Sequence, residues 1–330
     1  AVIRESNEEV IVKVLRPGLR DKARREIALL KDLAPSSGMK KIVGRLEESL
    51  LEELDLRLEA DNMRAGEVYF RPQKGIAPVY TTDLPTSKDV LIMDRAYDNT
   101  INKFGGDDLD LKREALGELL QLWFDEALFG SGFFHGDLHA GNIFFSPKPI
   151  PGYAPYGRDY QLTMIDFGNA ATLTSDEQRA LIGLILGSAS GSAPAVMASL
   201  EMLAPMTPEQ SEALGAYVAA TMEESEDASG AMDGIINRAI DLDVDLPKSL
   251  ILFNRGRAFI EKQIGETNDQ LDEYDPYDTL ERSNPRSIYQ GVMMSRIGTE
   301  LVKSAFGLHG ERGSRLDPAI LMEILKQYTW

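Results

Sequence analysis

The sequence predicts an α+β protein with a small mixed lobe over residues 1–96 and a larger α-rich lobe over residues 97–330. Three observations support this division. Along Val10–Leu15, valines alternate with Ile11, Lys13 and Leu15, the period of two that is typical of a strand. After Gly168 the apolar residues recur almost throughout at helical spacing. The charge divides in the same way, because residues 1–96 hold 17 basic and 17 acidic side chains and the remainder holds 18 basic and 36 acidic ones.

The elements of the small lobe follow from periodicity and from turn residues. A proline–glycine pair ends the first long strand, and a Pro-Ser-Ser-Gly segment separates the two helices. The predicted elements, in chain order, are a strand at Ala1–Ile3 that forms a hairpin with the strand at Val10–Leu15, helices over 21–33 and 46–70, and a strand pair at Val79–Tyr80 and Val90–Met93 around Pro85.

The large lobe begins with an amphipathic helix over 110–129 and becomes almost wholly helical after Gly168. Thr174 and Glu177 fit a capping box at the start of one helix. The acidic segment Asp269–Pro285 is predicted to be a surface loop. The remaining predicted helices span residues 174–188, 194–203, 208–225, 230–241, 247–264, 286–306 and 317–329.

Composition limits the classes of protein to which this chain can belong. It has 330 residues, a net charge of −18 and no cysteine. At about 100–200 residues per domain it is long enough for roughly two compact units. Without cysteine it forms no disulfide, thiolate metal site or cysteine nucleophile. The acidic excess opposes non-specific binding of nucleic acid, so we expect no nucleic-acid partner.

Targeting signals are not evident in the sequence. The chain begins at Ala1 without a methionine or a basic-then-apolar leader, which indicates a fragment or processed chain, and we expect no signal peptide. The charge-free run Ala180–Leu200 has the length of a membrane span. Its glycines, its serines and Pro194 favour two helices joined by a loop instead.

The densest group of polar residues lies in the loop His135–Asn142, just before the apolar strand Ile143–Phe145. A second apolar strand ends at Asp166–Phe167–Gly168, and the Pro-, Gly- and Tyr-rich insert Ser146–Tyr160 connects the two. This pattern is typical of phosphoryl transfer, in which one Asp accepts or orients the proton of the attacking hydroxyl. An Asn and a second Asp then supply oxygen ligands to Mg²⁺. Asp137, Asn142 and Asp166 fit these requirements.

The two histidines of the loop allow a metal site as an alternative. His135 and His139 are four residues apart, a spacing that binds Zn²⁺ when it lies on a helix, and with Asp137 or Asp166 they could form a two-His-one-carboxylate iron site. The loop glycines argue against a helix here. We therefore expect His135 to be structural and to anchor the loop.

Lys13 lies between apolar residues of a predicted strand. One interpretation is an edge lysine whose ammonium reaches water. The other is a phosphate-binding lysine that is paired with a helix glutamate, because an unpaired lysine among apolar neighbours is costly. Acidic candidates for the partner lie on the predicted helix over 46–70: Glu52, Glu53, Asp55, Glu59 and Asp61.

These residues together resemble the UbiB/AarF/ADCK family of atypical protein-kinase-like proteins, which is associated with ubiquinone biosynthesis. The resemblance runs from residue 1 to about residue 200 and more loosely over Leu246–Ile264. The family's Lys-x-Gly-Gln element and Ala-rich loop do not occur in the 330 residues. The resemblance rests on Val12–Gly18, Glu53–Ala60, His135–Asn142 and Asp166–Gly168.

The resemblance implies a bilobal protein-kinase-like fold whose small lobe is truncated at its N-terminus, and an atypical kinase or ATPase with the cofactors ATP and Mg²⁺. The implied catalytic residues are Lys13, which contacts the α- and β-phosphates, its partner Glu59, and the catalytic-loop Asp137. Asn142 and Asp166 are the implied metal ligands. The implied nucleotide-binding residues are Lys13, the Glu-x-Asp pair Glu53 and Asp55, and the adenine-facing hinge of Met93, Asp94, Arg95 and Ala96.

The expected partners are a nucleotide and lipid or quinone-pathway partners at a membrane. The expected location is cytoplasmic or organellar, in a mitochondrion or plastid and peripheral to a membrane. Two other functions stay open: a nucleotide-binding pseudokinase scaffold that has no turnover, and a small-molecule phosphotransferase that acts on aminoglycoside-like or choline-like alcohols. Enzymes of the second kind share a loop similar to His135–Asn142 but lack the Arg-Pro-Gly and Glu-x-Asp combination.

Overall fold

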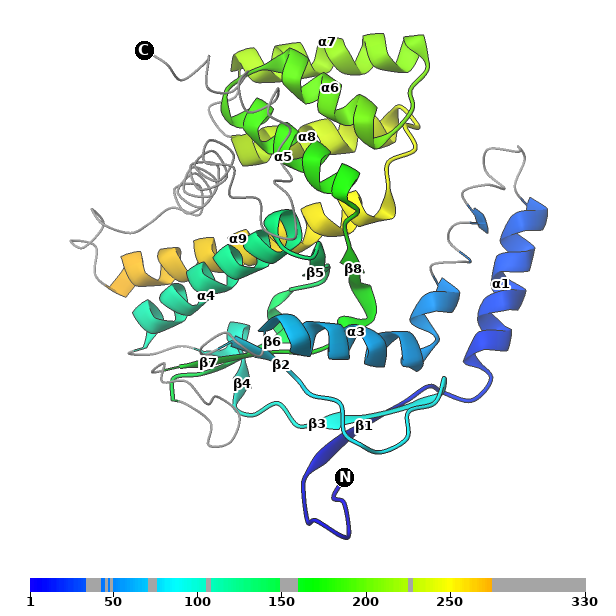
Figure 1. Ribbon diagram of the computed structural model, residues 1–330, viewed down its shortest axis with the longest axis vertical. Helices are drawn as coiled ribbons and strands as arrows, with labels where there is room; N and C mark the ends of the chain where they lie inside the picture. The colour runs from blue at the N-terminus through cyan, green and yellow to red at the C-terminus, as the bar shows by residue number, and fades with distance from the viewer. Residues whose placement is uncertain are drawn as a thin grey trace, which may run out of the picture. The chain divides into compact units, whose positions relative to one another are not determined.

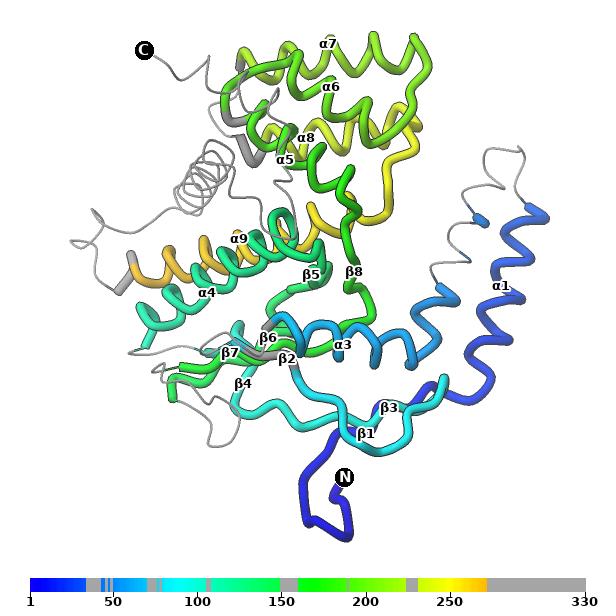
Figure 2. The backbone as a smooth tube through the Cα atoms, viewed as in Figure 1, coloured from blue at the N-terminus to red at the C-terminus, as the bar shows by residue number. Residues whose placement is uncertain are grey.

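The computed structural model describes residues 1–33, 43–44, 47, 50–70, 76–104, 108–148, 160–224 and 228–274 (Figures 1 and 2). The chain divides into two compact units, one formed by Ala1–Gly105 with Asp137–Ala170 and the other by Gly106–Gly136 with Ala171–Trp330. The expected boundary near residue 96 stays a prediction. Each unit is built from two stretches of chain, and the segment Asp137–Ala170 belongs to the same unit as the N-terminal residues.

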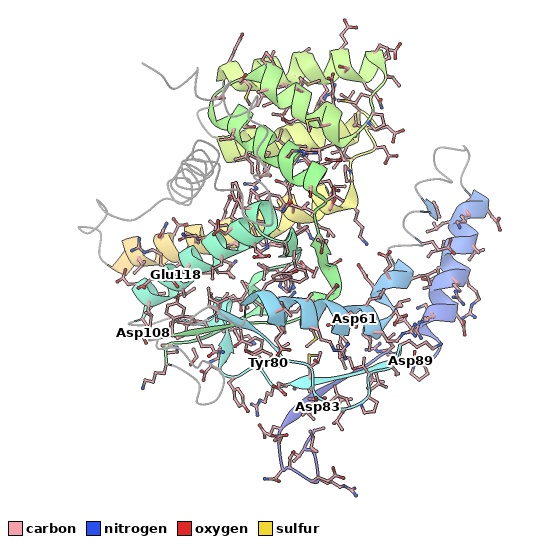
Figure 3. All side chains as sticks on the ribbon, viewed as in Figure 1. Asp61, Tyr80, Asp83, Asp89, Asp108 and Glu118 are labelled. Carbon is pink, nitrogen blue, oxygen red and sulfur yellow. The ribbon has the colours of Figure 1, made fainter. Side chains whose placement is uncertain are left out.

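The first unit begins with β1 (Val10–Val14), which pairs antiparallel with β3 (Val90–Asp94) so that Lys13 lies opposite Leu91. The N-terminal hairpin forms as expected, through a bridge between Val2 and Glu9. The helix α1 (Leu19–Leu33) follows, two residues longer at its start than predicted. Arg20 of α1 forms an ion pair with Asp89, which is labelled in Figure 3, and donates to Lys88 O at 2.6 Å.

The helix α3 (Leu56–Phe70) carries the buried face of this unit. The predicted continuous helix over 46–70 is wrong, because the chain leaves the helical conformation at Leu54 and Asp55. Asp55 ends one segment and begins the next: its carboxylate accepts from the backbone N–H of Arg57 at 3.1 Å. An aspartate favours this capping position, because its side chain satisfies a backbone donor that has no partner within the helix.

A four-stranded sheet completes the first unit, with the order β2 (Ile76–Pro78), β7 (Gln161–Met164), β6 (Ile143–Ser146) and β4 (Asn99–Thr100) (Figure 2). The strands β6 and β7 are antiparallel, as the sequence predicts for the two apolar runs around the insert. The strand predicted at Val79–Tyr80 is wrong. The strand lies at Ile76–Pro78 and pairs parallel with β7. The residues that follow it meet β3 through an isolated bridge from Thr81 to Met93 and through the N–H of Asp94, which donates to Tyr80 O.

The second unit is mainly helical. The strands β5 (Phe133–His135) and β8 (Ala170–Thr172) pair with each other, and neither was predicted. The helices α4 and α9 lie side by side (Figure 1), and Trp123 stacks on Phe253 with a centroid distance of 4.7 Å. The helices are α4 (Leu109–Phe124, continued by a π-turn at Asp125–Phe129), α5 (Ser175–Ala189), α6 (Ala193–Leu203), α7 (Pro208–Glu224), α8 (Ala228–Asp241) and α9 (Lys248–Tyr274).

These boundaries confirm most of the predicted helices. Both bonds of the capping box at Thr174 and Glu177 are present. The run Ala180–Leu200 forms α5 and α6 with a break between them, as expected. The helix α9 continues ten residues past the predicted end, so the predicted loop from Asp269 is wrong over its first residues. The predicted helices over 286–306 and 317–329 and nearly all of the insert lie outside the described residues.

No helix in the described part of the chain combines the length and apolar character that a membrane crossing needs.

Candidate functional site

The side chain of Lys13 is held between two carboxylates. Its Nζ lies 2.8 and 2.7 Å from the two oxygens of Glu59 and 3.0 Å from Asp166 Oδ1. Strand β1 supplies the lysine, and α3 supplies the glutamate from its first turn. Of the acidic side chains offered by the sequence, Glu59 is therefore the partner. The alternative of a lysine that only reaches water is wrong.

The three charges lie in different environments. The Glu59 side chain is 5% exposed, the Lys13 side chain 36% and the Asp166 side chain 48%. Burial raises the pKa of Glu59, and the nearby Asp166 raises it further, while Lys13 opposes both effects. Burial lowers the pKa of Lys13, but Glu59 and Asp166 outweigh that effect and raise it above its ordinary value. The lysine is therefore charged at neutral pH.

Asp166 follows strand β7 in a left-handed backbone conformation, with φ +62° and ψ +67°. Residues other than glycine rarely adopt this region, and Asp and Asn are among those that tolerate it best. Such conformations persist where surrounding contacts hold them, and they concentrate at functional sites. A short 3-10 turn, Phe167–Asn169, comes next.

The helix α3 also holds this turn, through residues that the sequence analysis did not single out. The Asn62 amide donates to the carbonyl oxygen of Phe167 at 2.9 Å. Gly66, one turn further along α3, leaves the space in which the Phe167 ring lies. The sequence alone does not predict roles for Asn62 and Gly66, because the residue they contact, Phe167, is about a hundred residues away in the chain.

The loop that follows β5 is closed by its own side chains. His139 Nδ1 accepts from the backbone N–H of Gly141 at 3.0 Å and so caps the turn Ala140–Asn142. The Asn142 amide donates to the carbonyl oxygen of Asp137 at 2.9 Å. Both bonds fix the path of the chain between Asp137 and Asn142.

His135 ends β5 and is fully buried in the second unit. Its carbonyl oxygen accepts from Trp123 Nε1 at 2.9 Å. Arg255 of α9 donates to the carbonyl oxygen of Gly136 at 3.2 Å. The strand that leads into the loop is thus anchored through its backbone by α4 and α9.

Strand pairing brings the predicted metal ligands close together. Ile143 of β6 lies opposite Met164 of β7, and the N–H of Ile165 donates to the carbonyl oxygen of Asn142 at 3.0 Å. Asn142 and Asp166 therefore flank the same end of this strand pair. The Asn169 amide lies 3.5 Å from Asp137 Oδ2, which joins the turn after Asp166 to the loop.

The donor set fits a magnesium ion. Because the Asn142 amide nitrogen is bonded to Asp137 O, its side-chain oxygen is the atom left for a metal. An amide oxygen and a half-exposed carboxylate are ligands that Mg²⁺ accepts together with phosphate oxygens and water. Within the described ranges, no group of three or more His, Asp or Glu side chains is arranged to hold a metal, and His139 Nδ1 is engaged with Gly141.

The Glu-x-Asp pair lies at the break before α3. Glu53 is exposed, whereas Asp55 binds Arg57 in a fork, with contacts of 2.9 and 2.6 Å. The hydrogen bond from the Arg57 side chain lowers the pKa of Asp55. Asp55 thus begins α3 and binds Arg57 rather than Lys13, and its assignment to a nucleotide stays a prediction.

The predicted hinge, Met93–Ala96, begins at the end of β3. The N–H of Asp94 donates to the carbonyl oxygen of Tyr80 at 2.9 Å, and Arg95 forms an ion pair with Glu9 at 2.5 Å. The Asp94 amide is therefore engaged within the protein, and the adenine contact of these residues stays a prediction.

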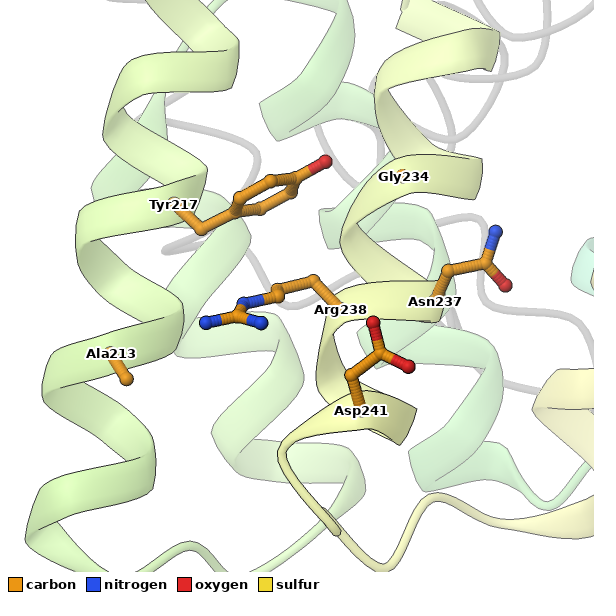
Figure 4. A pocket seen from close by; sticks show the side chains of 6 residues that line it. All are labelled: Ala213, Tyr217, Gly234, Asn237, Arg238 and Asp241. Carbon is orange, nitrogen blue, oxygen red and sulfur yellow. The ribbon is translucent and has the colours of Figure 1, made fainter.

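A separate hollow of about 590 Å³ lies between α7 and α8 in the second unit (Figure 4). Tyr217 and Arg238 extend across it from opposite helices, and none of the predicted site residues lines it.

The chain matches one protein family and is similar to several bacterial proteins. A family model described as the ABC1 atypical kinase-like domain matches residues 1–200. The uncharacterized protein Rv0647c of Mycobacterium tuberculosis (strain ATCC 25618 / H37Rv) is 28% identical over 285 residues, 78% of this chain and 55% of that protein. A probable protein kinase UbiB of Actinobacillus pleuropneumoniae serotype 5b (strain L20) is 30% identical over 192 residues, 53% of this chain and 33% of that protein. The chain spans about half and a third of their respective lengths.

Among solved structures, the complex of Rv3197 with erythromycin from Mycobacterium tuberculosis aligns with a TM-score of 0.49 and 18% identity, over 83% of this chain and 73% of that one.

Proposed function

Because this chain belongs to the ABC1 atypical kinase-like family, as its resemblance to the UbiB proteins predicted, we propose that it binds ATP with Mg²⁺ and transfers the γ-phosphoryl group to a hydroxyl or to water. The observation that carries the proposal is the Lys13 ammonium, 2.7 Å from Glu59 and 3.0 Å from Asp166. In ATP-dependent phosphoryl transfer, a lysine held by a helix glutamate contacts the phosphates, and an aspartate beside it holds the metal.

The other residues take roles that follow from their chemistry. Asn142 and Asp166 would hold Mg²⁺, which neutralises charge on the phosphates when it is bound. Asp137 accepts the proton of the attacking hydroxyl or water, and its backbone is fixed for this task by the amide of Asn142. Glu59 keeps the lysine ammonium in one place, so that Lys13 meets the phosphates without first having to be ordered.

A strongly acidic chain can bind a nucleotide if positive charge is concentrated at the site. A net charge of −18 repels a polyphosphate at long range. Near the site, the lysine and a bound metal reverse the local field. Salt screens the more distant charges over about 8–10 Å.

We place the activity in prenyl-quinone or lipid metabolism at a membrane surface, in the cytoplasm or in a mitochondrion or plastid. Support comes from the relatives named UbiB, of whose length the chain covers about a third. The nucleotide is the first partner, and a lipid or quinone-pathway component is the second.

The test combines binding and turnover on one set of proteins. Calorimetry measures ADP and ATP binding with and without Mg²⁺, and phosphate release measures turnover, for the unmodified chain, Asp137→Asn and Asp166→Ala. Arg179→Ala removes a partly exposed cation of α5, which is paired with Asp176, and serves as the control. We expect Asp166→Ala to lose the metal-dependent part of binding. Asp137→Asn should keep binding and lose at least about a hundredfold in turnover.

Equal turnover in all four proteins would contradict the proposal. Metal-dependent binding by every protein except Asp166→Ala, without turnover in any, would favour the pseudokinase scaffold. Phosphorylation of an aminoglycoside or a choline-like alcohol by the pure protein would favour the small-molecule phosphotransferase.

A further inference from the structure

The turn that carries Asp166 is held by a side chain from α3. The carbonyl oxygen of Phe167 accepts two hydrogen bonds, one from the Asn62 amide at 2.9 Å and one from the N–H of Ala170, which closes the 3-10 turn. A carbonyl oxygen has two lone pairs, so both are used. The bond from Asn62 joins residues 105 positions apart in the sequence.

The aromatic ring of this turn is fixed by the same helix. Phe167 is fully buried, and a Cβ added at Gly66 would lie 2.7 Å from its ring. Such a distance is too short for carbon atoms, so any larger residue at Gly66 would displace the ring. The ring of Phe167 therefore contacts α3 at Gly66, and its carbonyl oxygen contacts α3 at Asn62.

Three contacts follow one face of this helix. Glu59, Asn62 and Gly66 are spaced by three and four residues, so they lie one above the other on α3. Glu59 binds Lys13, and the other two bind the residue after Asp166. Asp61, labelled in Figure 3, and its partner Arg64 belong to the exposed face, where they form an ion pair at 2.8 Å.

The direction of the Asp166 carboxylate depends on this support. Its backbone is left-handed, with φ +62° and ψ +67°, and a rotation to an ordinary conformation would turn the side chain away from Lys13. The residues on either side determine whether this conformation persists. Asn62 and Gly66 act on the residue that follows Asp166, and Asn169 joins the end of the turn to Asp137.

We propose that Asn62 is a positioning residue: by holding the Phe167 carbonyl it keeps the Asp166 carboxylate beside Lys13, in the place where the carboxylate binds the metal of the nucleotide complex. Gly66 supports the same geometry by admitting the Phe167 ring. The part that concerns the metal rests on the proposed function, whereas the part that concerns the turn does not. The experiment therefore measures the two parts separately.

The variants are Asn62→Ala, which removes the donor, and Asn62→Asp, which keeps the size and places a carboxylate against the carbonyl. Gly66→Ala acts on the ring instead. Arg64→Ala, on the exposed face of the same helix, is the control, because its side chain is 51% exposed and its ion pair among the described residues is with Asp61. Circular dichroism checks that each protein is folded.

The first measurement is amide hydrogen exchange over residues 164–170 in metal-free, nucleotide-free protein. We expect exchange in this segment to become about tenfold faster in Asn62→Ala and in Gly66→Ala, and at least as fast in Asn62→Asp. Exchange in β1 and in the control should not change. Rates over residues 164–170 equal to those of Arg64→Ala would overturn the proposal.

The second measurement is the Mg²⁺ concentration that half-saturates ADP binding. It should rise about tenfold in Asn62→Ala, while ADP affinity without metal stays the same. Faster exchange with an unchanged Mg²⁺ requirement would overturn the positioning role. If the unmodified chain binds no nucleotide at any Mg²⁺ concentration, the proposed function fails, and the exchange data still decide whether Asn62 and Gly66 hold the turn.

Discussion

Removal of the Lys13 ammonium should leave Glu59 as a buried charge with no cation. We consider Lys13→Met, which keeps the length of the side chain, Glu59→Gln, which keeps its shape, and the double variant. The glutamate side chain is 5% exposed and both of its oxygens bind Lys13, at 2.7 and 2.8 Å. Among the described residues, no second cation forms an ion pair with Glu59.

The expected losses follow from burial. Breaking a fully buried ion pair by removing one partner costs about 3–5 kcal/mol. Because the Lys13 side chain is 36% exposed, water reaches one side of the pair, and we reduce the expectation for Lys13→Met to about 2–3 kcal/mol. Glu59→Gln leaves Lys13 with Asp166 and with water, and should lose about 1 kcal/mol. The double variant buries no charge and should lose less than Lys13→Met alone.

Urea unfolding of metal-free protein at pH 7, followed by circular dichroism, measures these free energies of unfolding. The coupling between Lys13→Met and Glu59→Gln in the double-variant cycle should be about 1–2 kcal/mol. Burial raises the pKa of Glu59, so the lone carboxyl in Lys13→Met takes up a proton as the pH falls through that raised value. The deficit of Lys13→Met should therefore shrink between pH 7 and pH 5. Additive losses, or a deficit that grows on acidification, would refute the reasoning.

Two further predictions concern the second unit. Burial lowers the pKa of Lys112, which is 3% exposed, so the unfolded chain binds more protons between the lowered value and the ordinary one near 10.5. Lys112→Met should raise the free energy of unfolding at pH 7 by about 1 kcal/mol, with a gain that shrinks as the pH rises toward 10; a loss at pH 7 would contradict this. Gly132 has φ +93°, and a Cβ there would collide with the carbonyl oxygen of Leu173. Gly132→Ala should lower the free energy of unfolding by about 2 kcal/mol or more. An unchanged melting temperature would contradict the predicted collision with Leu173.

The sequence predicted correctly those elements whose ends are fixed by residues close together in the chain. The start of α5 was predictable because Thr174 and Glu177 satisfy each other's backbone donors within four residues. The break before α3 was not predicted, although Asp55 is a capping residue, because the apolar spacing on both sides of it favours one long helix. The strand at Ile76–Pro78 was missed because it is three residues long and pairs with a partner more than eighty residues away.

Some contacts of the candidate site were also predicted from the sequence, and others were not. The pairing of Lys13 with Glu59 was expected from family resemblance, and the geometry agrees with it. The contacts of Asn62 and Gly66 with Phe167 were not expected, because neither residue type carries chemistry of its own. A role that consists of holding another residue becomes visible only when the two segments are seen together.

The Lys13 contacts also set the order in which the cluster can form during synthesis. Glu59 emerges 46 residues after Lys13, and Asp166 emerges 153 residues after it. At about 5–20 residues per second, the lysine–glutamate pair can close within roughly 2–9 s of translation, whereas the third member arrives after about 8–30 s. Until Phe167 has been synthesised, the place beside Gly66 that its ring fills has no occupant from this turn, although β2 and β3, which also pack on α3, have already emerged.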